Sequence, residues 1–96
     1  MDINKLMKEA RRMQEELQNK LSELRVEGSA GGGMVTVVMD GAKNVIDVKI
    51  SEEIFQENDV EMLQDLILAA LQDASAKVEE ESKNLIASFG LPPGLF

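Results

Sequence analysis

The stretch VEGSAGGGMVTVVMDGAKNVIDVKI, residues 26–50, determines the architecture because each part of it favours a β-strand or a turn. Residues 26–33 contain four glycines, which do not hold a helix well, so we expect a short irregular edge strand that ends in a glycine turn. Residues 34–39 are rich in β-branched side chains and predict a second strand.

The rest of this stretch predicts a hairpin. Asp40-Gly41 is a turn signal, in a loop that extends as far as Asn44 at most. Residues 45–50 then alternate in the manner of a half-buried strand, with one side formed by Ile46, Val48 and Ile50. We therefore expect a small antiparallel sheet of about two or three strands.

An amphipathic helix is predicted before the sheet, over residues 3–25. Its apolar residues recur at steps of three and four and form a stripe of about 120°, which is wide enough to face a core. The stripe consists of Ile3, Leu6, Met7, Ala10, Met13, Leu17, Leu21 and Leu24. We expect Asp2 or Asn4 to cap this helix.

A second and longer helix is predicted after the sheet, beyond one helical turn within residues 51–57. Asn58 is its expected N-cap, with Glu61 placed for a capping box. Gly90 is a stop signal, so the helix covers about 30 residues, or roughly 45 Å. Its apolar face is formed by Leu63, Leu66, Ile67, Leu71, Ala74, Val78, Leu85 and Phe89.

This second helix is too long for the sheet that it covers, because a six-residue strand spans only about 20 Å. The first helix is expected to cover part of the remainder. A second copy of the chain is the most economical cover for the rest, since two-fold dimers are the commonest oligomers. The alternative is that the helix frays or bends near Glu79-Glu80-Glu81, where Glu81 interrupts the apolar face.

Composition narrows the possible functions. The chain has 96 residues with no cysteine and no histidine. We expect one domain over residues 1–96, without disulfides, usual zinc ligands or the usual general base. The sequence has no apolar run of 18 residues and no leader-like N-terminus, which predicts a cytoplasmic protein without a membrane segment.

The residues do not form a recognisable catalytic motif. The glycine run ending at Gly33 precedes a strand and lacks a following Lys-Ser/Thr, so it does not fit a phosphate-binding loop. The serines and Thr36 have no histidine to activate them. The consecutive carboxylates of Glu79-Glu80-Glu81 diverge on a helix. We therefore expect no enzymatic activity, no metal, no cofactor and no small-molecule substrate.

The basic residues of the first helix indicate DNA. Lys5, Lys8 and Arg12 fall opposite the apolar stripe, and Arg11 flanks them. Such a row can contact phosphates, because counterion release drives binding to DNA independently of its sequence. We predict that Lys5, Lys8, Arg11 and Arg12 form a surface for duplex DNA.

Two alternatives stay open at this stage. Arg11 with Glu15, and Arg12 with Glu16, are spaced to form ion pairs along the helix surface. The net charge is −8, and residues 26–96 hold 4 basic and 13 acidic residues, which fits a protein partner better than DNA. The rival hypothesis is a dimeric protein-interaction module that does not bind DNA.

The order and spacing of several segments resemble the YbaB/EbfC family of bacterial nucleoid-associated proteins. The likeness is firmest at Val26-Glu27-Gly28 and at Ala30-Gly31-Gly32-Gly33-Met34-Val35. It also covers Asn4 to Ala10, Met13 to Glu15, Asp40-Gly41, Val48 to Ile50, Glu61 to Leu66 and Leu91 to Gly94.

The resemblance implies an α+β fold of order α-β-β-β-α and a homodimer whose long helices project like tweezers. It also implies a cofactor-free, DNA-binding role in nucleoid organisation and gene regulation, with the protein located at the nucleoid. The family's DNA contact is a basic helical surface, which matches Lys5, Lys8, Arg11 and Arg12 here. The second helix contributes only Lys77 and Lys83, so binding is expected to be weak and steeply salt-dependent.

Overall fold

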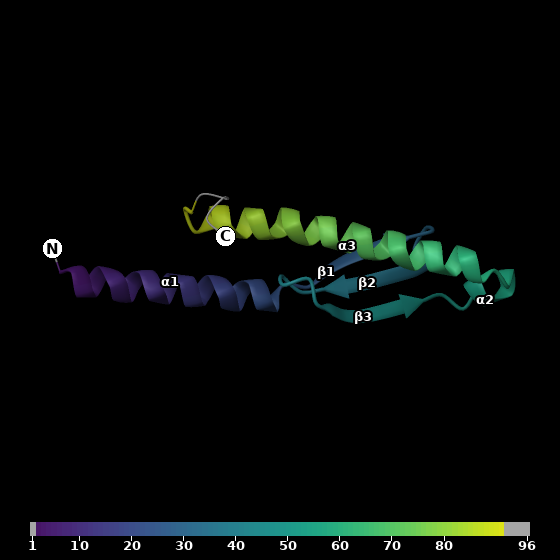
Figure 1. Ribbon diagram of the computed structural model, residues 1–96, viewed down its shortest axis with the longest axis horizontal. Helices are drawn as coiled ribbons and strands as arrows, with labels where there is room; N and C mark the ends of the chain where they lie inside the picture. The colour runs from purple at the N-terminus through teal and green to yellow at the C-terminus, as the bar shows by residue number, and fades with distance from the viewer. Residues whose placement is uncertain (1, 92–96) are drawn as a thin grey trace.

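The computed structural model describes residues 2–91 of the chain. The elements follow the order α1 (Ile3–Glu23), β1 (Val26–Ala30), β2 (Val35–Met39), β3 (Val45–Ile50), α2 (Ile54–Glu57) and α3 (Val60–Ser88). The predicted α-β-β-β-α order is confirmed, with α2 as a single turn before α3. The molecule is a rod of 68 × 19 × 16 Å, with the start of α1 at one end and α2 at the other (Figure 1).

The three strands form an antiparallel sheet in the order β1-β2-β3. The predicted glycine turn is confirmed, because Gly31–Gly33 all have positive φ angles and lead from β1 into β2. Residues 40–44 connect β2 to β3, so the longer of the expected loops is present. The Asp40 carboxylate holds this loop by accepting hydrogen bonds from the backbone N–H groups of Ala42 and Asn44.

The sheet has one apolar and one polar face. The register pairs Val35 with Ile50 and Val37 with Val48, so β2 and β3 direct these side chains to the same face. The opposite face carries mainly polar residues, namely Glu27, Ser29, Thr36, Asp47 and Lys49. Only the apolar face therefore requires cover.

α3 lies across the apolar face over β1 and β2 (Figure 1). The core between these elements consists of Val26, Val35, Val37, Met39, Ile54, Ala70, Ala74 and Val78. α3 approaches β1 closely because Gly28 has no side chain and faces the small residues Ala70 and Ala74. A Cβ atom on Gly28 would lie 2.6 Å from the Ala70 carbonyl oxygen, well inside van der Waals contact.

The prediction that the third strand is half buried is wrong for the single chain. All six residues of β3 are exposed, because α3 covers β1 and β2 and does not extend over the third strand. The alternation is correct for Val48 and Ile50, which pair with core residues of β2. At the start of β3 a register shift pairs Met39 with Val45 rather than with Ile46, so the predicted alternation does not hold there. β3 therefore presents an uncovered apolar side formed by Val48 and Ile50, with Ile46 next to them.

The helix ends differ slightly from the predictions. Asp2 caps α1, accepting a 3.1 Å hydrogen bond from the Asn4 N–H, and the helix ends at Glu23 rather than at residue 25 because β1 begins at Val26. The prediction that Asn58 caps the last helix is wrong.

Asp59 is the N-cap of α3, and its carboxylate accepts a hydrogen bond from the Met62 N–H. Glu61 is therefore one position too early for a capping box. Asn58 instead adopts a left-handed conformation, with φ 51°, and turns the chain between α2 and α3.

α3 is continuous through Glu79-Glu80-Glu81, so the predicted alternative of a frayed helix is wrong. The far half of α3 is already covered within the chain, because Val78 and Ile86 are only 1% and 6% exposed. α1 lies beside this half and buries Leu17 completely. The expectation that the first helix covers part of the longer helix is therefore confirmed, and uncovered apolar surface lies on β3 and α1.

Candidate nucleic-acid interface

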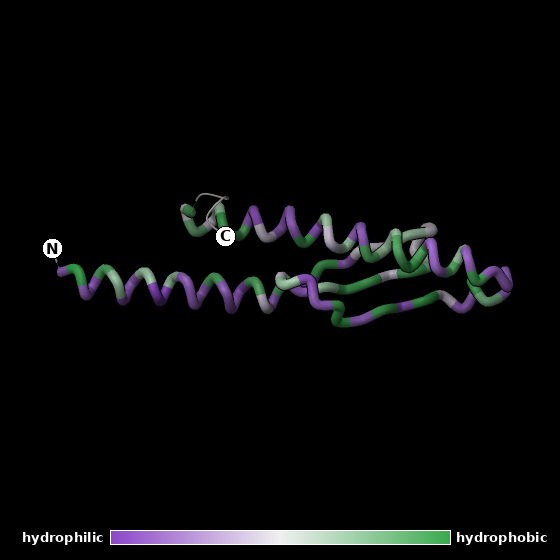
Figure 2. The backbone as a smooth tube through the Cα atoms, in the orientation of Figure 1, coloured by the Kyte–Doolittle hydropathy of each residue, from purple (hydrophilic) through white to green (hydrophobic). Residues whose placement is uncertain are grey.

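The predicted basic site lies on the free part of α1, which continues past the end of α3 (Figure 1). Every residue from Asp2 to Glu16 is exposed, whereas Leu17 is buried. We call residues 3–13 the arm, because Met13 is the last exposed apolar residue before Leu17. Green and purple alternate along the arm in Figure 2, as expected for an amphipathic helix without a partner on either face.

The four predicted site residues are gathered on the arm. Lys5, Lys8 and Arg12 are three and four residues apart, so their side chains project from the same side of the helix. Arg11 lies beside them, and all four side chains are exposed. Lys5 and Arg12 span seven residues, or about 10 Å along the helix axis. The arm therefore offers a short basic row to solvent.

The arginines of this row are not neutralised by the carboxylates that follow them. Over residues 2–91 the ion pairs are Lys43–Glu79 and Lys77–Asp73, neither of which involves the arm. The predicted alternative, in which Arg11 and Arg12 pair with carboxylates one turn later, is therefore not formed. Their guanidinium groups remain available to an external anion.

The other basic residues of α1 and its end have structural contacts. The Lys20 ammonium lies 5.5 Å from the centre of the ring of Phe89, the C-cap residue of α3, which is a cation–π distance. Arg25 donates hydrogen bonds of 3.0 and 2.8 Å to the carbonyl oxygens of Ser22 and Leu24 and so closes the end of α1. These two contacts lie at the end of α1 that is remote from the arm.

Sequence reasoning missed the role of Lys20, although a signal was present. Lys20 falls at the three-and-four spacing of the apolar stripe, between Leu17 and Leu24. A lysine at that position can lay its aliphatic part along the helix interface and bring its ammonium group to an aromatic ring or a carboxylate at the edge. Phe89 supplies the ring.

Two of the four lysines of the body, Lys43 and Lys77, form ion pairs with carboxylates. The Lys43 ammonium donates a hydrogen bond to Glu79 and lowers the pKa of that carboxyl. The pKa of Asp73 is lowered first by the Ser29 backbone N–H, which donates a 2.9 Å hydrogen bond, and then by Lys77. Positive charge in the body is therefore partly compensated, in contrast to the arm.

Charge is segregated along the rod. The arm holds four basic residues and only one acidic residue, Glu9. At the opposite end, the segment from Ser51 to Ala76 contains no lysine or arginine. An approaching polyanion is therefore attracted to the arm and repelled by the α2 end.

Two further features of the described residues bear on function. No helix within residues 2–91 is long and apolar enough to cross a bilayer. Over the same residues, no group of three acidic side chains converges in a way that would hold a metal ion.

The α-β-β-β-α order, with an acidic body and a free basic helix, defines a small α+β protein with a candidate surface for a polyanion. Comparison with known sequences specifies the class further. The chain belongs to the YbaB/EbfC DNA-binding family, whose sequence model matches residues 1–91. The resemblance inferred from the sequence is confirmed, and this family is one of DNA-binding proteins rather than enzymes.

Individual relatives agree with this assignment. A nucleoid-associated protein of Bacillus cytotoxicus is 52% identical over 83 residues, which cover 82% of this chain and 76% of that protein. A nucleoid-associated protein of Bacillus cereus is 48% identical over the same coverage. The crystal structure of the uncharacterized protein HP0035 from Helicobacter pylori matches with a TM-score of 0.70 and 31% identity, covering 92% of this chain and 96% of that one.

Proposed function

We propose that the chain binds duplex DNA as a cofactor-free homodimer at the nucleoid, in the cytoplasm, and alters the conformation of the DNA. The observation that carries this proposal is the arm, where Lys5, Lys8, Arg11 and Arg12 are exposed and unpaired at the free end of α1. Membership of a DNA-binding family supports duplex DNA as the polyanion. Roles in nucleoid organisation and gene regulation would follow from such binding.

Binding of this kind works through phosphates rather than bases. Neutralising each phosphate releases condensed counterions, and this release supplies most of the affinity of nonspecific complexes. Arg11 and Arg12 can each contact phosphate oxygens with two N–H groups, whereas Lys5 and Lys8 act as point charges. Phosphate contacts carry no information about the base sequence. The expected complex is therefore independent of sequence.

We place the dimer contact on the uncovered apolar side of β3. Val48 and Ile50 face the same side as the core but have no helix above them. A second copy on this side would extend the apolar layer that α3 covers over β1 and β2. A small domain benefits from such cover because it buries a limited fraction of its own surface.

A two-fold dimer would carry two arms, each with its basic row. Two rows held at a fixed separation can contact one duplex at two places and bend it without reading its sequence. The two-fold axis relates the rows, so each contact would be made twice. The dimer thus explains how a short row could give useful affinity.

A titration of duplex DNA in a gel-shift assay, at low and at physiological salt, tests the proposal. We expect a clear shift at low salt and a much weaker one at physiological salt, because few phosphates are contacted. The acidic balance of residues 26–96 favours the rival, a dimeric protein-interaction module. Absence of any shift at both salt concentrations would favour that rival.

A further inference from the structure

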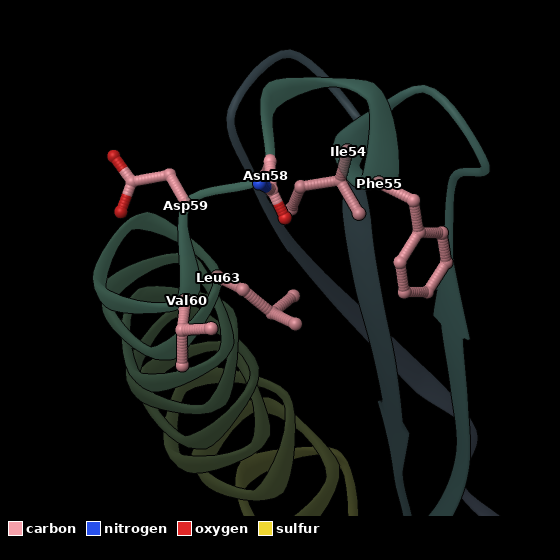
Figure 3. Close-up of a pocket in the computed structure, with 6 residues that line it drawn as sticks. All are labelled: Ile54, Phe55, Asn58, Asp59, Val60 and Leu63. Carbon is pink, nitrogen blue, oxygen red and sulfur yellow. The ribbon is translucent and has the colours of Figure 1, made fainter.

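The end of the rod opposite the arm has an exposed apolar hollow. It lies between α2 and the first turn of α3 and has a volume of about 140 Å³ (Figure 3). Its lining residues are Ile54, Phe55, Asn58, Asp59, Val60 and Leu63. Phe55 and Val60 at its rim are 66% and 68% exposed. We call residues 52–65 the head.

The head is strongly acidic. It contains no lysine or arginine, and its charged residues are Glu52, Glu53, Glu57, Asp59, Glu61 and Asp65, for a net charge of −6. The apolar hollow is thus surrounded by negative charge. A partner that fits it must combine an apolar side with positive charge.

The arm has this combination. Its apolar stripe is uncovered, with Ile3 71% and Leu6 48% exposed. With four basic residues and Glu9, its net charge is +3. Two arms brought together would repel one another, as would two heads, whereas an arm and a head attract. Charge complementarity therefore favours the head of another molecule as the binding partner of the arm.

We propose that the arm of one molecule docks its apolar stripe on the head of a second molecule, between Phe55 and Val60. Lys5, Lys8 and Arg12 lie on the side of the arm opposite the stripe, so they stay free for DNA in this arrangement. The docked arm also offsets the negative charge of the head, which would otherwise repel the duplex. Arm-to-head docking and DNA binding are therefore compatible.

This contact joins two different surfaces, so it is heterologous and does not close on itself by two-fold symmetry. Each molecule that has docked its arm still presents a free head. Repetition along a duplex would link dimers into a chain and make DNA binding cooperative. The docking itself requires neither DNA nor the β3 contact, so it can fail or succeed independently of the proposed function.

Complementation between two variants tests the proposal. Phe55→Ser removes the rim of the hollow and leaves the arm intact, whereas Leu6→Ser breaks the stripe and leaves the head intact. Both side chains are exposed, so both variants should fold. In sedimentation velocity we expect the wild-type protein to associate beyond the dimer as concentration rises, and each variant alone to lose this association.

A mixture of the two variants should regain association, because the intact arm of Phe55→Ser can dock on the intact head of Leu6→Ser. The regained species should weaken at high salt, where charges are screened within about 3 Å at 1 M. Failure of the mixture to associate, or unchanged association in either single variant, would overturn the proposal. Phe55→Ser should also retain wild-type affinity for a short duplex, which separates this contact from DNA binding.

Cysteine cross-linking gives a second measurement, since the chain has no cysteine of its own. A tagged Asn4→Cys protein, with the thiol beside the stripe, is mixed with Gln56→Cys protein, with the thiol beside Phe55, and oxidised. As a matched control, Gln72→Cys places the thiol on an exposed part of α3 outside the head. We expect several-fold more mixed disulfide with Gln56→Cys than with Gln72→Cys. Equal yields, or a predominance of Asn4→Cys homodimers, would show that the stripe has a different occupant.

Discussion

Gly28 on β1 lies directly against Ala74 on α3, so that a Cβ atom on Gly28 would be only 2.2 Å from the Ala74 backbone nitrogen. The atom that it would meet belongs to the backbone, so no side-chain rotation can relieve the clash. The absence of a side chain at Gly28 therefore allows α3 to pack directly on the sheet. This contact sets the position of α3, and hence of the surface on which α1 rests.

Gly28→Ala should lower the free energy of unfolding by roughly 1–3 kcal/mol, the usual range for overpacking, because α3 must move away from β1. Urea denaturation followed by circular dichroism measures the change. Glu27→Ala on the polar face of the same strand is the matched control and should have little effect. Equal stability of the two variants would show that α3 is not seated against Gly28.

Asp40 should make stability depend on acid pH. Its carboxylate accepts hydrogen bonds from the Asn44 side chain and from the Asn44 and Ala42 N–H groups, which lower its pKa below the ordinary 3.8. A carboxyl whose pKa is lowered by folding stabilises the native state above its unfolded pKa. That contribution is lost as pH falls through the folded pKa.

Urea midpoints measured from about pH 6 down to about pH 3 test this expectation. The urea midpoint of the wild type should stay constant at first. It should then decrease once the pH is below the ordinary pKa of an aspartate. Asp40→Asn should be less stable near neutral pH and show a shallower decline in acid, with the remaining slope due to Asp73 and Glu79. Parallel curves for the two proteins would contradict the role of Asp40.

Lys20 and Phe89 should be energetically coupled across the interface of α1 and α3. A double-mutant cycle with Lys20→Gln and Phe89→Leu should give a coupling of about 0.5–1 kcal/mol, as for a partly exposed cation–π contact. Thermal or urea unfolding of the four proteins provides the cycle. Additive effects of the two substitutions would mean that the ammonium is not held over the ring.

Val48→Asp should convert the proposed dimer into a monomer. The substitution puts a charge into the apolar side of β3 but leaves the single chain intact, because Val48 is already exposed there. Sedimentation velocity at micromolar concentration measures the mass, with circular dichroism as a check on folding. Lys49→Asp, on the opposite face of the same strand, is the control and should stay dimeric. A dimeric Val48→Asp protein would place the contact elsewhere.

Local signals predicted most of the secondary structure. The glycine turn at Gly31–Gly33, the Asp40 loop and the period of the two long helices are each properties of short segments, and all are present. The N-cap of α3 was misplaced by one residue because Asn58 and Asp59 are both good caps. The left-handed turn at Asn58 and the hydrogen bond from the Met62 N–H to the Asp59 carboxylate distinguish them.

Tertiary burial was less predictable. The sequence pattern shows that β3 has an apolar side but not that α3 stops short of it. In the same way, the periodicity of α1 runs evenly from Ile3 to Leu24, although only the part from Leu17 onward meets α3. Element lengths predicted that the first helix covers only part of the far half of α3, but not which part. The structure shows that the end of α1 supplies this cover at Leu17 and Lys20.

All residues of the candidate site lie on one helix, so the site could be predicted from the sequence. The spacing of Lys5, Lys8, Arg11 and Arg12 determines their side of the helix wherever α1 lies. Whether these residues form ion pairs with carboxylates depends on side-chain rotamers. Whether they are free of contact with α3 depends on where α3 ends. Both of these points required the structure.

DNA binding by the arm is tested most sharply by the salt dependence of affinity for a duplex in the variant Lys5→Gln, Lys8→Gln, Arg12→Gln. The matched control is Lys49→Gln, Lys77→Gln, Lys83→Gln, which removes the same charge from the body. The logarithm of the affinity should fall less steeply with the logarithm of salt in the arm variant, by about 0.9 for each phosphate that the arm no longer neutralises. The control should keep a slope close to that of the wild type. An arm variant that bound with wild-type affinity and slope would contradict the assignment of the arm as the DNA-binding surface.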